Sequence, residues 1–140
     1  MKNITILLAI IILFTAKLVV AEDFSITFAN KYSMDAAVET PLGVLKAISV
    51  QGVFSDSRGH SGVVNCIATS GKNLDFVCDS TDEDGDISYS SGRRTGDAGE
   101  AIITGGTGKY ENITSQCEYQ LASFSKDIMV GLITMQCSDK

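Results

Sequence analysis

The feature that most constrains the fold of this chain is a glycine-rich segment at residues 104–114, which reads TGGTGKYENIT. Its three glycines, at positions 105, 106 and 108, follow an apolar run at residues 101–103. Glycine adopts positive φ and lets another backbone approach closely, so this combination is typical of a strand that enters a bulge or a barrel corner. The segment therefore predicts a β-sheet that bends sharply at this point.

The chain after residue 22 alternates apolar segments with polar, glycine-rich turns. Strands are expected at residues 24–28, 44–54, 63–69, 74–78, 87–90, 100–104, 117–123 and 128–137. Such a succession, with one proline and 13 glycines, predicts an all-β domain. We expect a small antiparallel β-barrel of about eight strands, because closure removes aggregation-prone edges; a two-sheet β-sandwich is the alternative. Only residues 34–38 have a composition that allows a short helical turn.

Residues 1–21 have the composition of a cleavable export signal. Lys2 gives a short basic start, an apolar run fills residues 4–16, and small residues occupy positions 19–21. Lys17 interrupts the apolar stretch, which leaves it shorter than the about 20 residues that a spanning helix needs. We expect cleavage after Ala21, a single β-barrel domain over residues 22–140, and a secreted or periplasmic location. A retained anchor is the alternative.

The charge of the chain limits the partners that it is expected to have. The full sequence has a net charge of −6, and cleavage removes two basic residues, Lys2 and Lys17, so the mature domain is more acidic still. An acidic surface repels phosphate groups, which argues against nucleic-acid binding and against docking on an anionic membrane. A basic protein remains a compatible partner.

The four cysteines all follow the signal and are expected to form two disulfides. The sequence has no CxxC spacing and a single histidine, His60, so a zinc site lacks its usual ligands, and no cofactor is expected. A hairpin register that opposes Cys66 and Cys78, or Cys117 and Cys137, also opposes apolar residues. We therefore predict these two pairs. A bond between the hairpins, Cys78 to Cys117, is the main alternative.

An acidic segment at residues 79–86 reads DSTDEDGD. Alternating carboxylates before a glycine are a feature of calcium loops. Alignment with an EF-hand loop, however, places Ser80 and Ser91 at the two end positions, where Asp and Glu are required. We interpret the segment as a solvated hairpin turn with Asp-Gly chemistry. Weak calcium binding is the alternative.

Few other residues are candidates for chemistry. His60 lies in the turn-like sequence SRGHSG, and nothing marks its neighbour Ser61 as a nucleophile, so an exposed turn histidine is expected. Arg93 and Arg94 lie in a glycine-flanked loop and are candidate contacts to a carboxylate of a ligand or partner. The sequence identifies no catalytic residue.

The glycine-rich segment also carries a family resemblance. The residues concerned are Gly105, Gly106, Thr107, Gly108, Lys109 and Tyr110, with Ile113 and Thr114 after them. They resemble the GGTGKYxxIT signature of small uncharacterised bacterial secreted proteins, in which a cysteine and an acidic turn also precede the glycines. Ser115 stands where that signature continues with glycine. A looser likeness extends to plant dirigent proteins and allene oxide cyclases, which are eight-stranded barrels. The resemblance implies that fold, and no activity, because one fold hosts many functions.

Three functions are compatible with these observations. The first is an exported, non-enzymatic barrel that binds a small apolar ligand or a protein partner. The second is a barrel enzyme of the cyclase or isomerase type, which would act mainly through pocket shape. The third is an acidic inhibitor of a cationic hydrolase, whose basic surface would suit this domain. Eight strands leave an interior that side chains can fill or that holds one small ligand, so the interior distinguishes these functions.

Overall fold

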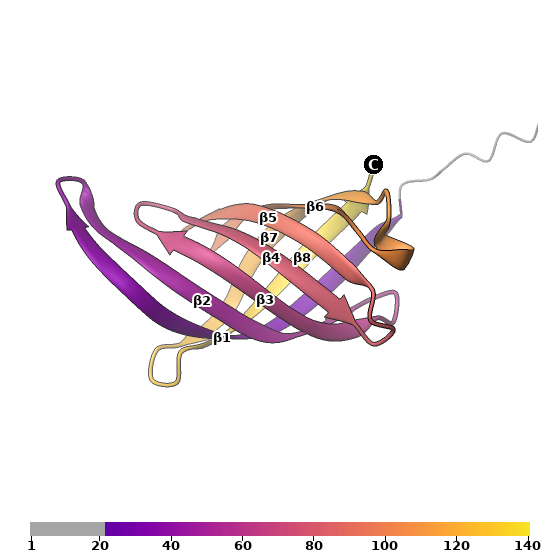
Figure 1. The fold of residues 1–140 in the computed structure, drawn as a ribbon, viewed down its shortest axis with the longest axis horizontal. Coiled ribbons are helices and arrows are strands. Elements are labelled where there is room, and N and C mark those ends of the chain that lie inside the picture. Colours follow the sequence, from indigo (N-terminus) through magenta and orange to yellow (C-terminus); the bar gives the residue numbers. More distant parts are fainter. Residues whose placement is uncertain (1–21) are drawn as a thin grey trace, which may run out of the picture.

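The computed structural model describes residues 22–140; the expected signal peptide, residues 1–21, lies outside the described residues. The described chain forms eight strands and one short 3-10 helix (Figure 1). Their bounds are β1 (Asp23–Thr40), β2 (Gly43–Asp56), β3 (Ser61–Ser70), β4 (Leu74–Asp82), β5 (Ile87–Thr95), β6 (Ala98–Gly106), η1 (Gly108–Tyr110), β7 (Thr114–Ser125) and β8 (Val130–Asp139). Within residues 22–140, no helix has the length and apolar character needed to cross a membrane.

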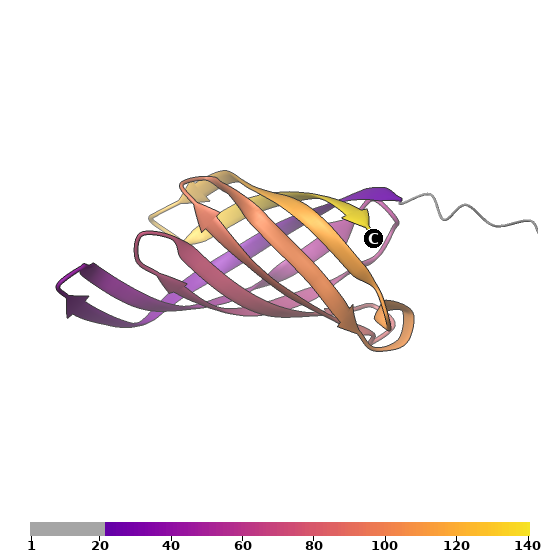
Figure 2. The ribbon, with the colours of Figure 1, turned by 90° about the horizontal axis from the view of Figure 1, so that it is seen from above.

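The strands form one closed barrel in sequence order. Each strand pairs antiparallel with the next, and β1 closes the sheet by pairing with β8 from Asp23–Ser138 to Lys31–Val130. The two views at right angles show the strands tilted around a common axis (Figures 1 and 2). The predicted eight-stranded antiparallel barrel is confirmed, and the two-sheet sandwich is wrong.

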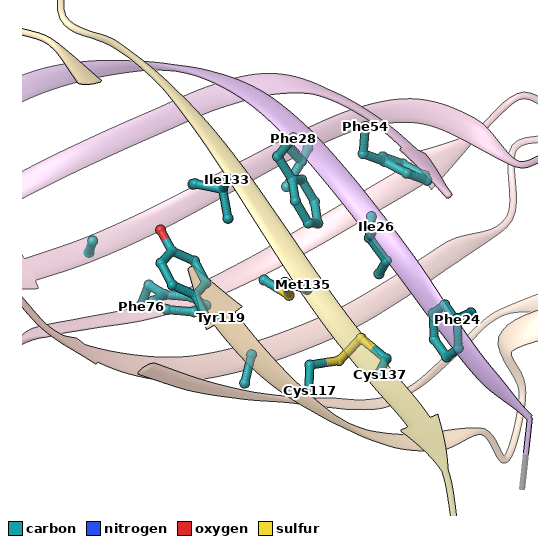
Figure 3. Close-up of a cluster of buried hydrophobic side chains, with 13 residues drawn as sticks. Phe24, Ile26, Phe28, Phe54, Phe76, Cys117, Tyr119, Ile133, Met135 and Cys137 are labelled. Carbon is teal, nitrogen blue, oxygen red and sulfur yellow. A yellow bond between two sulfur atoms is a disulfide. The ribbon is translucent and has the colours of Figure 1, made fainter. Parts of the chain in front are cut away.

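The barrel has its core inside because apolar residues alternate with polar ones along each strand. In β7, for example, Cys117 and Tyr119 are buried while Gln116, Glu118 and Gln120 are exposed. The buried apolar side chains meet in one cluster (Figure 3). Its members are Phe24, Ile26, Phe28, Phe54, Val64, Ala68, Phe76, Ala101, Cys117, Tyr119, Ile133, Met135 and Cys137.

These side chains nearly fill the barrel. Two small spaces remain among them, with volumes of about 30 and 50 Å³. Aromatic rings occupy much of the rest: Phe76 and Tyr119 lie 5.5 Å apart between ring centroids, and Phe28 and Phe54 lie 6.1 Å apart. Cavities that hold drug-sized ligands have volumes of about 300–1,000 Å³. The interior as it stands therefore has no room for such a ligand.

Two disulfides cross-link neighbouring strands from inside the barrel. Cys66 of β3 bonds Cys78 of β4, and Cys117 of β7 bonds Cys137 of β8. In each pair the two cysteines face one another directly in the strand register, as the hairpin argument predicted. Cys117 and Cys137 are buried in the apolar cluster (Figure 3). The bond between hairpins, Cys78 to Cys117, does not form.

A two-stranded ribbon made of β1 and β2 projects beyond the rest of the barrel (Figures 1 and 2). β1 pairs with β2 as far as Thr40–Gly43, whereas β1 pairs with β8 only to Lys31 and β2 pairs with β3 only from Lys46. The helical turn allowed at residues 34–38 is therefore wrong: these residues are strand, with a register shift between Met34 and Ala36. The cross-strand partner supplied by β2 outweighs the local helical preference, which is weak over five residues.

Candidate functional site at the mouth of the barrel

The glycine-rich segment and the acidic segment lie together at one end of the barrel, here called the ionic end (residues 56–61, 82–87 and 106–115). β6 ends at Gly106, and η1 then places Lys109 against the turn between β4 and β5. Lys109 Nζ lies 2.9 Å from Asp82 Oδ2 and 2.6 Å from Asp84 Oδ2. The backbone N–H of Lys109 also donates to Asp86 Oδ2, at 3.1 Å. The two motifs of the sequence are thus each other's partners.

Asp82 is the buried centre of this network. Its Oδ1 accepts hydrogen bonds from the backbone N–H groups of Asp84 and Asp86, both at 3.0 Å. Burial by itself raises the pKa of the Asp82 carboxyl, but hydrogen bonds from Lys109, Asp86, Tyr110 and Asp84 outweigh burial and lower this pKa from 3.8 to about 2. The carboxylates in turn raise the pKa of Lys109. Both groups are charged at neutral pH and hold the two turns together.

Two of the glycines are required by this contact. Gly106 lies so close to the backbone of β5 that a Cβ on it would be 1.7 Å from the carbonyl oxygen of Ile87. Gly108 has φ 51°, and a Cβ there would be 1.9 Å from Asp86 Oδ1. The predicted sharp bend with close backbone approach is present, and its role in the structure is to dock Lys109 on the acidic turn.

The acidic segment is less solvated than the sequence suggested. The turn after β4 contains Gly85 with φ 85°, as an Asp-Gly turn requires, but the Asp82 side chain is fully buried. Asp82, Asp84 and Asp86 all contact Lys109. Within residues 22–140, no group of three or more His, Cys, Asp or Glu side chains is placed to hold a metal ion.

His60 is part of the same end and is half-buried, not exposed. Its Nδ1 lies 3.0 Å from Asp56 Oδ2, and its ring packs edge-on against Tyr110 at 6.4 Å between centroids. Nearby, the Arg58 guanidinium lies over the Phe24 ring and pairs with Asp139 at 2.7 Å. These contacts cover the apolar cluster at the ionic end. They give His60 a structural role.

The opposite end of the barrel, here called the mouth, is hollowed by a cavity of about 190 Å³. Its apolar lining comes from β1, β2, β4, β7 and the turn between β7 and β8. These residues are Met34, Ile48, Leu74, Leu121, Phe124 and Met129. Tyr32, Lys46, Ser70 and Arg94 complete the lining. Tyr32 and Leu74 also border the 30 Å³ space beneath it, so the mouth leads toward the filled interior.

The floor of the mouth holds a small polar group among aromatic rings. Burial raises the pKa of the Tyr32 hydroxyl, and Tyr119, Arg94 and Asn30 nearby partly oppose this rise. Burial and the neighbouring Tyr32 raise the pKa of Tyr119. Both hydroxyls therefore stay protonated and can donate hydrogen bonds. Asn30 is 5% exposed, and its Oδ1 has no hydrogen-bond partner within residues 22–140.

Two glycines make space for this arrangement. Gly52 faces Asn30 in the strand register, and a Cβ on it would lie 2.1 Å from Asn30 Oδ1. Gly131 lies beside the rings of Tyr32 and Phe124, which meet edge-on at 5.5 Å between centroids. The sequence offered a signal for Gly52, because it is an isolated glycine within the apolar segment of β2. It did not indicate that Asn30 would occupy the space beside this glycine.

The structure separates the two arginines that the sequence analysis named together. They are consecutive residues of β5, so their side chains point to opposite faces of the sheet. Arg93 is exposed on the outer face, where its Nε lies 2.5 Å from Asp75 Oδ1. Arg94 is half-buried and lines the mouth. Reading β5 as a strand through residue 95, rather than ending it at residue 90, would have distinguished them.

Comparison with known proteins identifies the fold. No protein-family model matches the sequence, and a search of curated proteins finds no match. Among solved structures, the barrel is similar to the pterocarpan synthase dirigent protein GePTS1, with a TM-score of 0.61 and 16% sequence identity. The match covers 86% of this chain and 92% of that chain. At this identity the similarity shows that the chain has the dirigent-type barrel fold.

Proposed function

We propose that this protein is an exported binding protein that takes up a small, largely apolar molecule at the mouth of its barrel. The observation that carries the proposal is the 190 Å³ cavity, whose lining is mainly apolar and whose floor holds protonated tyrosine hydroxyls. Apolar walls with a few placed polar groups are the usual composition of a ligand site. The similarity to a dirigent protein supports the choice of a barrel site.

The filled interior limits where and how large the ligand is. The interior spaces of about 30 and 50 Å³ are too small for it, so the ligand belongs at the mouth. The mouth is itself smaller than the cavities that take drug-sized molecules. We therefore propose a compact ligand, such as a single ring or a short chain.

Export is part of the proposal. Two disulfides persist in oxidising compartments and are rare in the cytosol, which supports a secreted or periplasmic location. The signal-like composition of residues 1–21 supports the same location, with cleavage after Ala21. The GGTGKY segment supports kinship with small bacterial secreted proteins. Sequencing the N-terminus of the mature protein from its host tests the cleavage site.

The binding proposal is tested by NMR of methionine methyl groups in the oxidised protein. Met34 and Met129 line the mouth, whereas Met135 lies in the filled interior. Fragments of mixed polarity, titrated to millimolar concentration, are expected to shift the first two methyls more than the third. Ser70→Trp fills the mouth and is expected to remove the shifts, and Thr69→Trp, on the outer face of the same strand, is expected to keep them. Unmoved Met34 and Met129 signals for every fragment would refute the proposal.

A protein partner is the second candidate, and the projecting ribbon favours it. Leu42 at its tip is 100% exposed, and Met34, Val38, Val44 and Leu45 are about half exposed. An isolated two-stranded ribbon is marginally stable, so a partner that covers it would stabilise it. The acidic character of the chain makes a basic protein the compatible type, including a cationic hydrolase. Cross-linking in the native compartment tests this candidate.

The cyclase or isomerase alternative has one specific support, the paired hydroxyls of Tyr32 and Tyr119 beneath the mouth. A buried carboxyl with a raised pKa would favour acid catalysis. The buried Asp82 carboxyl has the opposite shift, to about 2, and lies at the ionic end. Turnover of a fragment that is lost in Tyr119→Phe would establish this alternative.

A further inference from the structure

Arg94 is a charged side chain in the lining of the mouth, which is otherwise mainly apolar. Its guanidinium contributes a permanent positive charge to a cavity with apolar walls. Its Nε is buried and has no hydrogen-bond partner within residues 22–140. A polar N–H group that is buried without an acceptor is costly, so the half-buried Arg94 has hydrogen-bonding capacity that residues 22–140 leave unused.

The described chain supplies no ion-pair partner for Arg94. Among the ion pairs of residues 22–140, none includes Arg94 or Lys46, the second cation of the lining. The strand register opposes Asp75 and Glu100 to Arg93 rather than to Arg94, and Asp75 pairs with Arg93 on the outer face. Within residues 22–140, the mouth therefore combines apolar walls with two cations that form no ion pair with a carboxylate.

The acidic residues of the ionic end do not cancel this positive charge. Residues 87 to 94 of β5 separate the two ends by roughly 20–25 Å of strand. The Debye length at physiological ionic strength is about 8 Å, so the ionic end has little effect on an anion at the mouth. Lys109 also neutralises part of its charge.

We infer that the ligand of the mouth is a small apolar molecule that carries a carboxylate, and that Arg94 receives this carboxylate. The inference rests on the binding function proposed above and adds the chemical class of the ligand. A carboxylate contacts a guanidinium best through two parallel hydrogen bonds, and within residues 22–140 no carboxylate forms an ion pair with Arg94. Lys46 adds a second positive charge at the rim, and the apolar body of the ligand contacts Leu121, Phe124 and Met129.

The test uses two probes with the same body and different head groups, 4-phenylbutyrate and 4-phenylbutan-1-ol. Each is titrated into the oxidised protein, and the dissociation constant is read from the methyl shifts of Met34 and Met129. We expect the carboxylate to bind about tenfold more tightly than the alcohol, which is the size of effect expected for one charged hydrogen-bonded contact. Arg94→Gln is expected to abolish this preference, and Arg94→Lys to keep part of it.

Arg93→Gln is the matched control, because it removes the same charge from the adjacent position on the outer face. It is expected to leave the preference unchanged. Equal binding of the two probes, or a preference that survives Arg94→Gln, would overturn the inference while leaving a binding mouth in place. Failure of both probes and of all other fragments to shift either methyl would overturn the proposed function and the inference together. The melting temperature of each variant shows that it is folded.

Discussion

At the scale of single residues, the ionic end depends on a buried carboxylate and on glycines that let the chain reach it. Lys109 reaches Asp82 only because Gly106 and Gly108 bring η1 against β5 and the acidic turn. A side chain at either glycine would meet atoms of β5 or of Asp86. Charge and backbone shape are therefore coupled at this end, and each is open to a separate test.

The charge is tested through the dependence of stability on pH. The pKa of Asp82 is about 2 in the folded chain and 3.8 for the free group, so the unfolded state takes up the proton first as the pH falls. The Asp82 carboxylate therefore contributes about 2 kcal/mol to the free energy of unfolding, and this contribution is complete above about pH 4 and is lost as the pH falls toward 2. Asp82→Asn is expected to lower stability at neutral pH and to flatten its pH dependence between pH 4 and 2, measured by urea unfolding. Asp84→Asn, whose side chain is 67% exposed, is the control with a smaller effect, and an unchanged pH slope in Asp82→Asn would contradict the account.

The backbone shape is tested by comparing two glycines with similar positive φ. Gly96 has φ 63° and nothing within 4 Å of an added Cβ, whereas Gly108 has φ 51° and Asp86 Oδ1 at 1.9 Å. Gly96→Ala is expected to cost about 1 kcal/mol for the left-handed backbone alone. Gly108→Ala is expected to cost about 2–3 kcal/mol, because the contact with Asp86 is also lost. Equal unfolding free energies for the two variants would show that the close contact is absent.

At the scale of strands and hairpins, the covalent cross-links are distributed unevenly around the barrel wall. One disulfide fastens β3 to β4 and the other fastens β7 to β8. The ribbon of β1 and β2, by contrast, has only its own cross-strand pairs beyond Tyr32, whose N–H donates to the carbonyl oxygen of Met129, and beyond Lys46. The account therefore expects stable hairpins on the wall and a ribbon that opens easily.

Removal of each disulfide by paired Cys→Ala substitutions tests the first expectation. The bonds close loops of 12 and 20 residues, and loss of either is expected to cost about 2–4 kcal/mol. The Cys117–Cys137 pair is expected to cost more, because its loop is longer and its sulfurs lie in the buried cluster, where alanines leave a cavity. Thermal unfolding of the two double variants gives the order. A larger loss for the Cys66–Cys78 pair would contradict it.

Amide hydrogen exchange tests the second expectation. Residues 36–45 pair only within the ribbon, so their amides are expected to exchange far faster than those of residues 48–54, which lie between two strands of the barrel. The measurement is made on dilute protein, and repeated at high concentration to detect association. Protection of residues 36–45 in the dilute sample would show that the ribbon is covered, in favour of the protein-partner candidate.

At the scale of the whole molecule, the barrel was predictable because several short sequence patterns all indicate the same antiparallel strands and turns. Apolar alternation marked the strands, the positions of Cys66 and Cys78 fitted one hairpin register, and glycines marked the corner. The mouth was not predictable to the same degree. Arg94 became distinguishable from Arg93 only once β5 was seen to continue past residue 90, because a shift of one position exchanges the two faces of a sheet.

The interior was the least predictable feature of the molecule, because packing depends on which side chains from eight strands meet at each level of the barrel. The sequence was compatible with both an empty and a filled interior. The structure nearly fills it with Phe, Tyr, Met and disulfide sulfurs, and the cavity at the mouth, of about 190 Å³, is larger than the space of about 30 Å³ beneath it. The division of the molecule into a filled barrel, a tightly bonded ionic end and a hollowed mouth follows from this packing.

The claim that the mouth is the binding site is tested most directly by a crystal structure of the oxidised protein grown with 4-phenylbutyrate. The account predicts density for the phenyl ring among Leu121, Phe124 and Met129, with the carboxylate against Arg94 and the interior side chains unmoved. Density for the probe deep in the barrel, with the aromatic cluster displaced, would contradict the claim, and so would density confined to the outer wall.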